Sequence, residues 1–549
     1  MTNHEIADIF ELLSKLMDIH GANSFQSKSY SSAAFKIEKL PTPLVDMSAD
    51  ARNTIPGIGS SIAAKIEEIL STNKLSALDE ILSKTPEGIL DIMKIKGLGP
   101  KKIALLWNEL GVESIGELEY ACQENRLTSI KGFGEKMQNN VLQSIAFIRQ
   151  NAGYMLYAEA ENIVDQLTTA LQQEYPNHIF QVTGAYRRQM PTLGSIDFVS
   201  NLTATELKSV FPEMNIIAAT AIVLNCQFEA FATPINIYAC NQDNVGSILF
   251  KTTVDKDNIL LASEIPDNYA NEEAIFTALG LPFIPPAIRE NIYPKETMIA
   301  LSQQAIIQSS AEIKGVIHCH STYSDGKNTL KEMALAAIEK GYEYMIISDH
   351  SQAAFYANGL SPERIKEQHI EIEALNKSLA PFKIFKSIEA DILNDGQLDY
   401  NDEVLQQFDI VIASVHSNLK MSEEKAMTRL LTAIANPHTR ILGHPTGRLL
   451  LAREGYPIDH KAIIDACIKH KVVIEINANP KRLDLDWTWI HYALEKGAIL
   501  SINPDAHSIN GIDVNKYGVL AAQKGGLTPT QNLSSYSLSA IEEFIRTKK

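Results

Sequence analysis

The sequence contains few cysteines, and they are neither paired nor clustered. The 549 residues include five of them, with no Cys-x-x-Cys motif: Cys122, Cys226, Cys240, Cys319 and Cys467. An odd and scattered set argues against a disulfide framework and indicates a reducing compartment such as the cytoplasm. We find no apolar run of about 18 residues, which argues against a membrane span. The first residues, MTNHEIADIFELL, lack the basic and then apolar pattern of a signal peptide, and we expect none.

An excess of positive charge is also missing. The chain has 49 Lys+Arg and 66 Asp+Glu, a net charge of −17, which alone argues against nucleic-acid binding. The acidity is uneven, because residues 1–150 hold 16 basic and 19 acidic side chains (net −3) and the remainder holds 33 and 47 (net −14). The near-neutral first part is therefore compatible with DNA, and divalent cations would offset some of the acidity elsewhere.

Histidine is equally uneven. Of the 14 histidines, three precede residue 311 and 11 follow it. A region that gathers histidines among carboxylates is a candidate metal site before any motif is considered.

The pattern of apolar residues changes along the chain. Residues 4–145 are typical of short amphipathic helices, and residues 151–240 alternate helical segments with β-rich runs. From residue 313 onward a strand–loop–helix pattern repeats, with seven strands: IKGVIHCH, YMIISDH, FKSIEADIL, IVIASVHS, TRILGHP, VVIEINA and AILSINPDAH. This alternation predicts a parallel α/β barrel.

Three copies of a glycine motif punctuate the N-terminal region. They read IPGIGSSIAAKI at 55–66, IKGLGPKKIALL at 95–106 and IKGFGEKMQNNV at 130–141. Each is an apolar residue, a Gly-x-Gly turn and a helix start, which exposes backbone N–H groups that bind a phosphate oxygen without reading a base. The alternative is that the turns only join helices, and it fits the third copy best. The candidate DNA-binding residues are Gly57, Gly59, Ser60, Lys65, Gly97, Gly99, Lys101, Lys102, Gly132 and Gly134.

With these helix-hairpin-helix motifs, the chain resembles a bacterial family X DNA polymerase with a C-terminal polymerase-and-histidinol-phosphatase (PHP) domain. The resemblance covers nearly the whole sequence. It implies a multidomain fold: a helical N-terminal region, an α+β nucleotidyltransferase-like palm and thumb, and a distorted α/β barrel. The implied domains are a gap-binding domain (1–80), fingers (81–149), a palm (150–240), a thumb (241–308) and the PHP barrel (309–549).

The palm departs from the family pattern, which is Gly-Ser-x-Arg-Arg, then Gly-Asp-x-Asp, then a third Asp on a later strand. In this chain the three stretches read GAYRR at 184–188, GSID at 194–197 and ATPINIYA at 232–239. Only Asp197 remains, because Ser195 and Asn236 hold the other two carboxylate positions. Since two-metal synthesis needs all three carboxylates, we expect no Mg²⁺ in the palm and no polymerase activity. The relict site comprises Gly184, Arg187, Ser195, Asp197 and Asn236.

Three further features are the thumb motif, a possible substitute for a missing carboxylate, and Lys65. The thumb motif of the family, Thr-Gly-Ser with a later Asn, is replaced by TTVDKDN at 252–258. Glu229 or Asp243 is the alternative source of a missing carboxylate. Lys65 stands where some members of the family carry a Schiff-base lysine for 5′-deoxyribose-phosphate removal, and the alternative is a solvated helix face.

The barrel region keeps a complete set of metal-ligand types. They follow the ends of the predicted strands, where a parallel barrel places its active site. The candidate ligands are His318, His320, Asp325, His350, Glu389, His416, His444, Asp505 and His507. We expect His318 and His320 to alternate along a strand and to face the same side, with Cys319 opposite. Mixed nitrogen and oxygen ligands suit Mn²⁺ or Zn²⁺.

The resemblance implies three divalent metals. One takes His318, His320, Glu389 and Asp505. A second shares Glu389 and adds His416 and His444, and a third takes Asp325, His350 and His507. The candidate catalytic residues are Glu389, Asp505, His318 and Arg448, with Arg448 preferred over Asp349, Lys420 and Arg482 as a phosphate contact.

The function expected from these features is a DNA-repair-type enzyme. The helix-hairpin-helix motifs hold gapped or nicked DNA, and the barrel trims 3′ ends as a metal-dependent 3′→5′ exonuclease. The alternatives are a gap-filling polymerase with proofreading, a small-molecule phosphatase of the histidinol-phosphate kind, and a non-catalytic DNA-end sensor. We expect a monomer in the bacterial cytoplasm, associated with the nucleoid and without a membrane partner.

Overall fold

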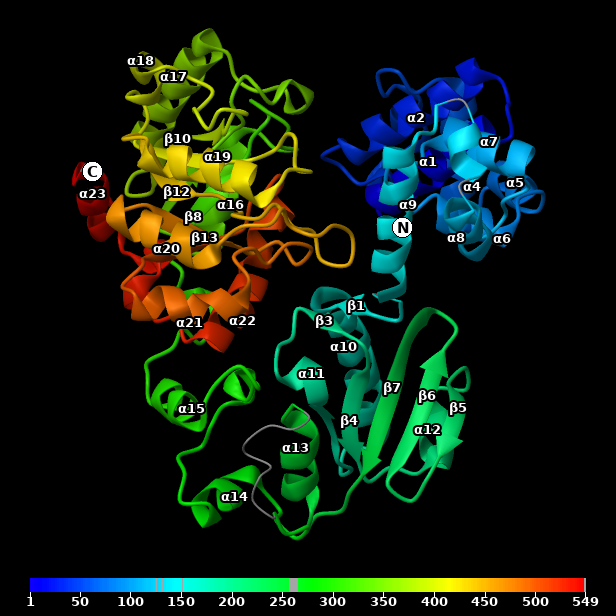
Figure 1. Ribbon diagram of the computed structural model, residues 1–549, viewed down its shortest axis with the longest axis vertical. Helices are drawn as coiled ribbons and strands as arrows, with labels where there is room; N and C mark the ends of the chain where they lie inside the picture. The colour runs from blue at the N-terminus through cyan, green and yellow to red at the C-terminus, as the bar shows by residue number, and fades with distance from the viewer. Residues whose placement is uncertain (125, 131, 151, 256–264, 548–549) are drawn as a thin grey trace. The chain divides into compact units, whose positions relative to one another are not determined.

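The chain forms two compact units, residues 1–152 and residues 153–549. The computed structural model in Figure 1 describes residues 1–549 except 125, 131, 151, 256–264 and 548–549. Among the described helices, none combines the length and apolar character needed to cross a bilayer.

The first unit is helical. Its α-helices are α1 (Asn3–Ile19), α2 (Ser24–Glu38), α3 (Ala49–Asn53), α4 (Ser60–Thr72), α5 (Ser76–Leu82), α6 (Glu87–Ile92), α7 (Pro100–Leu110), α8 (Ile115–Gln123) and α9 (Glu135–Gln150). A capping box of Thr2 and Glu5 starts α1, which buries an apolar face that includes Phe10. One apolar core joins these helices, from Ile6 to Ile145.

The second unit begins with a five-stranded sheet in the order β2-β4-β7-β6-β5, which we call the palm sheet. Its strands are β2 (Phe180–Thr183), β4 (Ile196–Ser200), β5 (Asn215–Ala219), β6 (Val223–Phe228) and β7 (Phe231–Ala239). Only β4 and β7 run parallel to one another, which places Asp197 opposite Asn236. A two-stranded antiparallel sheet, β1 (Met155–Leu156) and β3 (Thr192–Leu193), lies apart from it.

Helices complete this region of the second unit. With the palm sheet come α10 (Tyr157–Glu174), α11 (Gly184–Arg187) and α12 (Ala204–Val210), followed by α13 (Val245–Thr253), α14 (Glu272–Ala278) and α15 (Lys295–Ser302).

Seven parallel strands then form one sheet in sequential order, β8 to β14. They are β8 (Gly315–Cys319), β9 (Tyr344–Ile347), β10 (Lys383–Asp391), β11 (Ile410–Ser414), β12 (Thr439–Leu442), β13 (Val473–Asn477) and β14 (Leu500–Asn503). The segment after β14 pairs with β8, since the Ala506 amide donates to the His318 carbonyl (3.2 Å) and the His320 amide donates to the Ala506 carbonyl (2.8 Å). The sheet therefore closes almost completely, which confirms the predicted barrel of seven strands.

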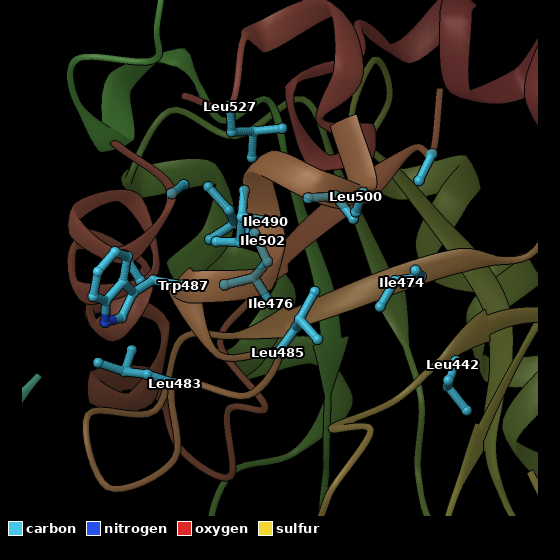
Figure 2. Packing of buried hydrophobic residues seen from close by; sticks show 14 of the residues in the cluster. Leu442, Ile474, Ile476, Leu483, Leu485, Trp487, Ile490, Leu500, Ile502 and Leu527 are labelled. Atoms are coloured by element: carbon cyan, nitrogen blue, oxygen red, sulfur yellow. The ribbon is translucent and has the colours of Figure 1, made fainter. Parts of the chain in front are cut away.

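Helices lie between the strands and after the last one. They are α16 (Leu330–Glu339), α17 (Pro362–Ser378), α18 (Asp402–Leu405), α19 (Glu423–Ala435), α20 (His460–Lys469), α21 (Trp487–Glu495), α22 (Asn515–Gly525) and α23 (Leu538–Arg546). Figure 2 shows the strand side chains Ile476 and Ile502 beside Ile490 of α21, and Trp487 of the same helix beside Leu483. The strands are buried along almost their whole length, as expected for a parallel sheet covered by helices.

Buried charges join the palm region to the barrel. Lys524 of α22 is fully buried, and its ammonium group donates to the Arg188 carbonyl (2.8 Å) and to Glu290 Oε1 (2.6 Å). Arg188 also contacts Glu290 (3.1 Å), so one carboxylate links two cations from distant parts of the chain. One apolar cluster contains Phe250 of α13 and residues of the barrel strands, so the region of α13 to α15 packs against the barrel.

Candidate metal centre and DNA-binding turns

The first strand of the barrel carries two histidines past a β-bulge. The register between β8 and β9 shifts between Ile317 and Cys319, and His318 has φ +63°. Both rings reach the same centre and Cys319 lies in the apolar core, as expected, but the bulge and the left-handed backbone of His318 replace the regular alternation that the sequence predicts. Cys319 is fully buried among apolar residues, as expected of a core side chain. The two histidines meet because the bulge re-aims one of them.

Glu389 of β10 lies at the middle of the centre. Its two carboxylate oxygens are surrounded by five histidine rings. Oε1 lies 3.1 Å from Nε2 of His416, 3.1 Å from Nε2 of His444 and 3.3 Å from Nε2 of His318. Oε2 lies 2.9 Å from Nδ1 of His350 and 3.7 Å from Nε2 of His320. Glu389 can therefore bridge two cations.

Two aspartates extend the centre to its open side. Asp505 Oδ1 lies 3.1 Å from His320 Nε2 and 3.6 Å from His318 Nε2. Asp325 Oδ1 lies 3.4 Å from His507 Nε2 and 3.7 Å from His350 Nε2. All nine residues predicted from the sequence are therefore brought together at the carboxyl ends of the barrel strands.

The side chains fit divalent cations by geometry. Three groups each gather their ligand atoms within 4.8 Å: His320, Asp325, His350 and His507; His318, His320 and Asp505; and His350, Glu389 and His416. Within the described part of the chain, buried His318 Nε2 and Glu389 Oε2 make no hydrogen bond. A buried polar atom without a partner is costly, and a metal ion would satisfy both atoms.

The electrostatics also fit bound cations. Burial by itself lowers the pKa of His318, yet Glu475, Glu389 and Asp505 reverse this effect and the net shift is well upward. Burial raises the pKa of Glu389, but the neighbouring histidines bring it well below its usual range. The centre thus holds carboxylates that stay ionised although they are buried, and divalent cations would balance that charge.

Two carboxylates behind the histidines were missed by the sequence prediction. Glu475 Oε2 accepts a hydrogen bond from His318 Nδ1 at 2.6 Å, and Asp391 Oδ1 accepts one from His416 Nδ1 at 2.7 Å. Each contact fixes a proton on Nδ1 and directs Nε2 at Glu389, where a metal ion would take the place of the second proton. A signal was present, because Asp391 follows Glu389 by two positions on a strand and Glu475 is a lone acid in the apolar run VVIEIN.

Asp349 positions the loop that carries Asp325. Its carboxylate is fully buried and accepts from the backbone amides of Ser321 (2.8 Å) and Ser324 (3.2 Å). Gln368 of α17 donates to its other oxygen at 2.6 Å. Asp349 therefore supports the centre from behind rather than contacting a substrate.

The structure does not support Arg448 as the phosphate contact. Its Nε donates to the Arg482 carbonyl at 2.9 Å, and its two terminal nitrogens contact Asp486 and the Leu483 carbonyl. These internal partners hold Arg448 in the loop structure. Arg482 is better placed, because its Nε lies 4.0 Å from Asp505 Oδ2 and its side chain is 20% exposed.

The three glycine motifs of the first unit share one backbone geometry. The first glycine of each is left-handed, with φ +79° at Gly57, +92° at Gly97 and +94° at Gly132. The second glycine precedes the helix, and no side chain caps α4 or α7, at Gly59 and Gly99. The first amides of α4 and α7 thus have no side-chain cap, which is the geometry that the expected phosphate contact requires.

The other candidate DNA-binding residues lie on the helices that follow these turns. Ser60 and Lys101 are exposed, and Lys65 and Lys102 are half-buried. Lys102 Nζ lies 3.3 Å from the Gly97 carbonyl and above the Phe133 ring of the third motif, at 5.9 Å from its centroid. The second and third motifs therefore form a pair. Gly134 starts α9, and its carbonyl accepts from the Met137 amide (2.9 Å).

The palm residues form an internal hydrogen-bond network. Asn236 Nδ2 donates to Asp197 Oδ1 at 2.8 Å, and Asn225 Nδ2 donates to Asn236 Oδ1 at 2.7 Å. Burial raises the pKa of Asp197, while hydrogen bonds from Asn236 and Ser195 act in the opposite direction. Gly184 leaves room for this carboxylate, since an added Cβ would lie 2.1 Å from Asp197 Oδ2. The two residues that replace carboxylates thus donate to the remaining one.

The arginines of GAYRR also have internal partners. Arg187 Nη2 contacts Glu272 Oε2 at 2.5 Å and Nη1 donates to Thr253 Oγ1 at 2.7 Å, so both terminal nitrogens have partners within the protein. Glu229 lies in the turn before β7 and is separated from Asn236 by about 16 Å of extended strand. Asp243 is exposed beyond the end of β7. Of the altered thumb motif, residues 256–258 lie outside the described residues.

Three family models match parts of the chain. Residues 1–75 match the helix-hairpin-helix domain family, residues 89–145 the SAM-like helix-hairpin-helix tandem, and residues 317–479 the PHP domain. A probable phosphatase of Caldanaerobacter subterraneus subsp. tengcongensis is 31% identical over 169 residues, 29% of this chain and 60% of that protein. A probable phosphatase of Thermoanaerobacter sp. (strain X514) is 27% identical over 250 residues, 42% of this chain and 94% of that protein.

One relative matches from end to end. The DNA polymerase/3'-5' exonuclease PolX of Bacillus subtilis (strain 168) is 34% identical over 577 residues, which cover 100% of both chains. Its match spans the paired glycine turns, the palm sheet and the histidine-rich barrel alike. The chain therefore belongs to the bacterial PolX family, whose members join helix-hairpin-helix motifs to a C-terminal PHP domain.

Proposed function

We propose that this protein binds gapped or nicked DNA and hydrolyses phosphodiester bonds at 3′ ends in its barrel, while its palm no longer adds nucleotides. The observation that carries the proposal is the Glu389 carboxylate, buried among five histidines and beside Asp505. The name of the Bacillus subtilis relative, with its 3'-5' exonuclease, supports the same reaction. The protein acts as a monomer on DNA of the bacterial nucleoid.

Three Mn²⁺ or Zn²⁺ ions would be held by the barrel. His318, His320, Glu389 and Asp505 would hold one ion, and Glu389, His416 and His444 a second. Asp325, His350 and His507 would hold the third. When bound, such ions generate a hydroxide nucleophile at neutral pH and neutralise charge that develops on the phosphate. The 3.1 Å between Glu389 Oε1 and His444 Nε2 and the 3.4 Å between Asp325 Oδ1 and His507 Nε2 support this assignment.

The chain's own residues prepare the site for this chemistry. Glu475 and Asp391 hold protons on Nδ1 of His318 and His416, so that both Nε2 atoms face the centre and would be the atoms that bind a metal ion. Arg482, near Asp505, lies where it can donate to a phosphate oxygen. Gly59 and Gly99 leave helix amides open to the phosphates of the DNA backbone.

The palm supports no synthesis. Ser195 and Asn236 donate hydrogen bonds to Asp197, so the remaining carboxylate is satisfied without a metal ion. A single carboxylate carries too little charge for two Mg²⁺ ions. A gap-filling polymerase remains the second candidate only because the full-length relative is named a DNA polymerase.

The test is an end-labelled primer on a gapped template, incubated with Mn²⁺ or Mg²⁺, with and without deoxynucleotides. We expect shortening of the primer with Mn²⁺ and no extension with either ion. Extension that disappears in Asp197→Asn would show that the palm is active. Faster hydrolysis of small phosphate monoesters than of DNA ends would favour a phosphatase, as the names of the shorter relatives suggest.

A further inference from the structure

We propose that Lys36 of α2 is a phosphate ligand of the first glycine turn, to which it supplies from another helix the positive charge that the turn itself lacks. This inference rests on the proposed function, in which the turn binds DNA. An added Cβ at Gly57 would lie 1.6 Å from Lys36 Nζ. The Lys36 ammonium group therefore lies directly against the left-handed glycine of the turn, two residues before Gly59, which precedes α4.

The first glycine motif has no lysine at its turn, since residues 55–61 read IPGIGSS. The second motif does have one, because Lys102 Nζ lies 3.3 Å from the carbonyl of Gly97, its left-handed glycine. The position equivalent to Lys102 is held in the first motif by Ile62, which is 8% exposed and packs in the apolar core. Both turns therefore have an ammonium group at the left-handed glycine, from the following helix in one case and from α2 in the other.

The position of Lys36 is unfavourable unless an anion joins it. The first turn of α4, a helix of 13 residues, carries the positive end of the helix dipole and has no side-chain cap. The half-buried Lys36 ammonium group is a like charge beside it, and it makes no hydrogen bond or ion pair with any residue that the structure describes. These two positive groups repel one another, whereas a phosphate group can accept from both the ammonium group and the helix amides.

A backbone phosphate of DNA is the anion that suits this site. Residues 1–150 have a net charge of −3, so attraction to DNA depends on cations placed at individual contacts. A lysine that contacts a phosphate reads no base and raises the affinity for all sequences alike. Neutralising a phosphate also releases counterions, so the contact contributes to the salt dependence of binding.

Binding of a fluorescein-labelled gapped duplex to the full-length protein tests this role, with EDTA present so that no DNA is hydrolysed. In Lys36→Met, which removes the charge and nearly keeps the side-chain length, we expect the affinity to fall about tenfold, as for one charge-assisted hydrogen bond. The slope of log affinity against log salt should become shallower by about 0.9. Lys84→Met, at an exposed lysine that pairs with Glu80 outside the glycine motifs, should change neither quantity.

A double-mutant cycle shows whether Lys36 and the turn hold the same phosphate. Gly59 has φ −77° and open space around an added Cβ, so Gly59→Val would block the phosphate without disturbing the fold. We expect Lys36→Met to cause no further loss of affinity in the Gly59→Val protein. In the Gly99→Val protein, which is altered at the second turn, the two losses should multiply.

Unchanged affinity in Lys36→Met, or independent losses from Lys36→Met and Gly59→Val, would overturn the inference. If either occurs while Gly99→Val still weakens binding, the DNA contact of the glycine turns in the proposed function stands without Lys36. If the cycle behaves as expected but the wild type with Mn²⁺ leaves the 3′ end intact, the proposed hydrolysis fails and the Lys36 contact stands.

Discussion

At the residue scale, two histidines of the barrel each have a carboxylate behind the ring. The Glu475 carboxylate also accepts from Asn477 Nδ2 (3.0 Å), from Asn503 Nδ2 (2.8 Å) and from the His444 amide (3.1 Å). Four donors from separate strands thus converge on one fully buried acid. Glu475 therefore fixes both the tautomer of His318 and the position of the strand end that carries His444.

Replacing Glu475 by Gln tests this positioning role. The change preserves shape but replaces a carboxyl group that accepts four hydrogen bonds with an amide, one end of which can only donate. We expect Mn²⁺ affinity to fall about 10- to 100-fold, as for other residues that orient metal ligands. The measurement is metal titration with dialysis and elemental analysis. Glu373→Gln, the same change at an exposed residue of α17, serves as the control and should leave the affinity unchanged. An unaltered affinity in Glu475→Gln would contradict the role.

The residue scale also shows what the sequence could and could not predict. The nine ligand candidates were predictable because each is a His, Asp or Glu at or after a strand end. Arg448 was not, because a long side chain can reach several partners and its direction depends on Asp486, which is distant in sequence. Arg482 is the same residue type, but the tertiary structure directs its guanidinium group toward Asp505 instead.

At the scale of elements, the glycine motifs were predicted more fully than strand β8. The motifs need only local geometry, a left-handed glycine and an open helix start, and both are properties of the sequence itself. The bulge in β8 is not local, because His318 and His320 both pair with Ala506 at the closure of the barrel. Sequence alternation alone could not predict it.

A substitution at Gly99 tests the phosphate-binding turn without disturbing the fold. Gly99 has φ −76°, which any residue adopts, and no atom lies within 4 Å of an added Cβ. In Gly99→Val the side chain would occupy the space that a phosphate needs. We expect DNA affinity to fall about tenfold, the cost of one charge-assisted hydrogen bond. Fluorescence anisotropy with two oligonucleotides of unrelated sequence measures the change.

The matched control is Gly116→Val in α8, where an added Cβ also meets open space. It should leave DNA affinity unchanged. If Gly99→Val lowers the affinity for only one oligonucleotide, the turn reads bases. If the affinity for both oligonucleotides is unchanged, the turn that contains Gly99 is not part of the DNA interface.

At the scale of the whole molecule, residues 153–549 form one compact unit that contains a network of buried charges. Arg188, Glu290 and Lys524 come from three regions of the chain that lie far apart in sequence, and each is at most 8% exposed. Burial, the largest effect, lowers the pKa of Lys524 to about 8, although Glu290 opposes the shift. Such a network could not be predicted from sequence, because Arg188 belongs to the GAYRR motif but nothing in the sequence pairs it with Glu290 or Lys524.

Lys524→Met tests whether this network stabilises the second unit. Removing one buried cation leaves Glu290 with a single partner, and we expect the apparent free energy of unfolding to fall by about 1–3 kcal/mol. The melting temperature from calorimetry measures the effect. The transition of the helical first unit should not move, because its core is separate. A second-unit transition at the wild-type temperature would show that the buried network adds no net stability.

The most direct test of the proposed function is release of a labelled 3′-terminal nucleotide by the wild type, Glu389→Gln and Asp197→Asn. Glu389 lies beside five histidines of the barrel, and Asp197 belongs to the palm sheet. With Mn²⁺ restored after chelation, we expect Glu389→Gln to be slower by about 10³-fold, since losing a bridging charge removes several kcal/mol of stabilisation. Asp197→Asn should release the labelled nucleotide at the wild-type rate. Full activity in Glu389→Gln, or loss of activity in Asp197→Asn, would contradict the assignment of hydrolysis to the barrel.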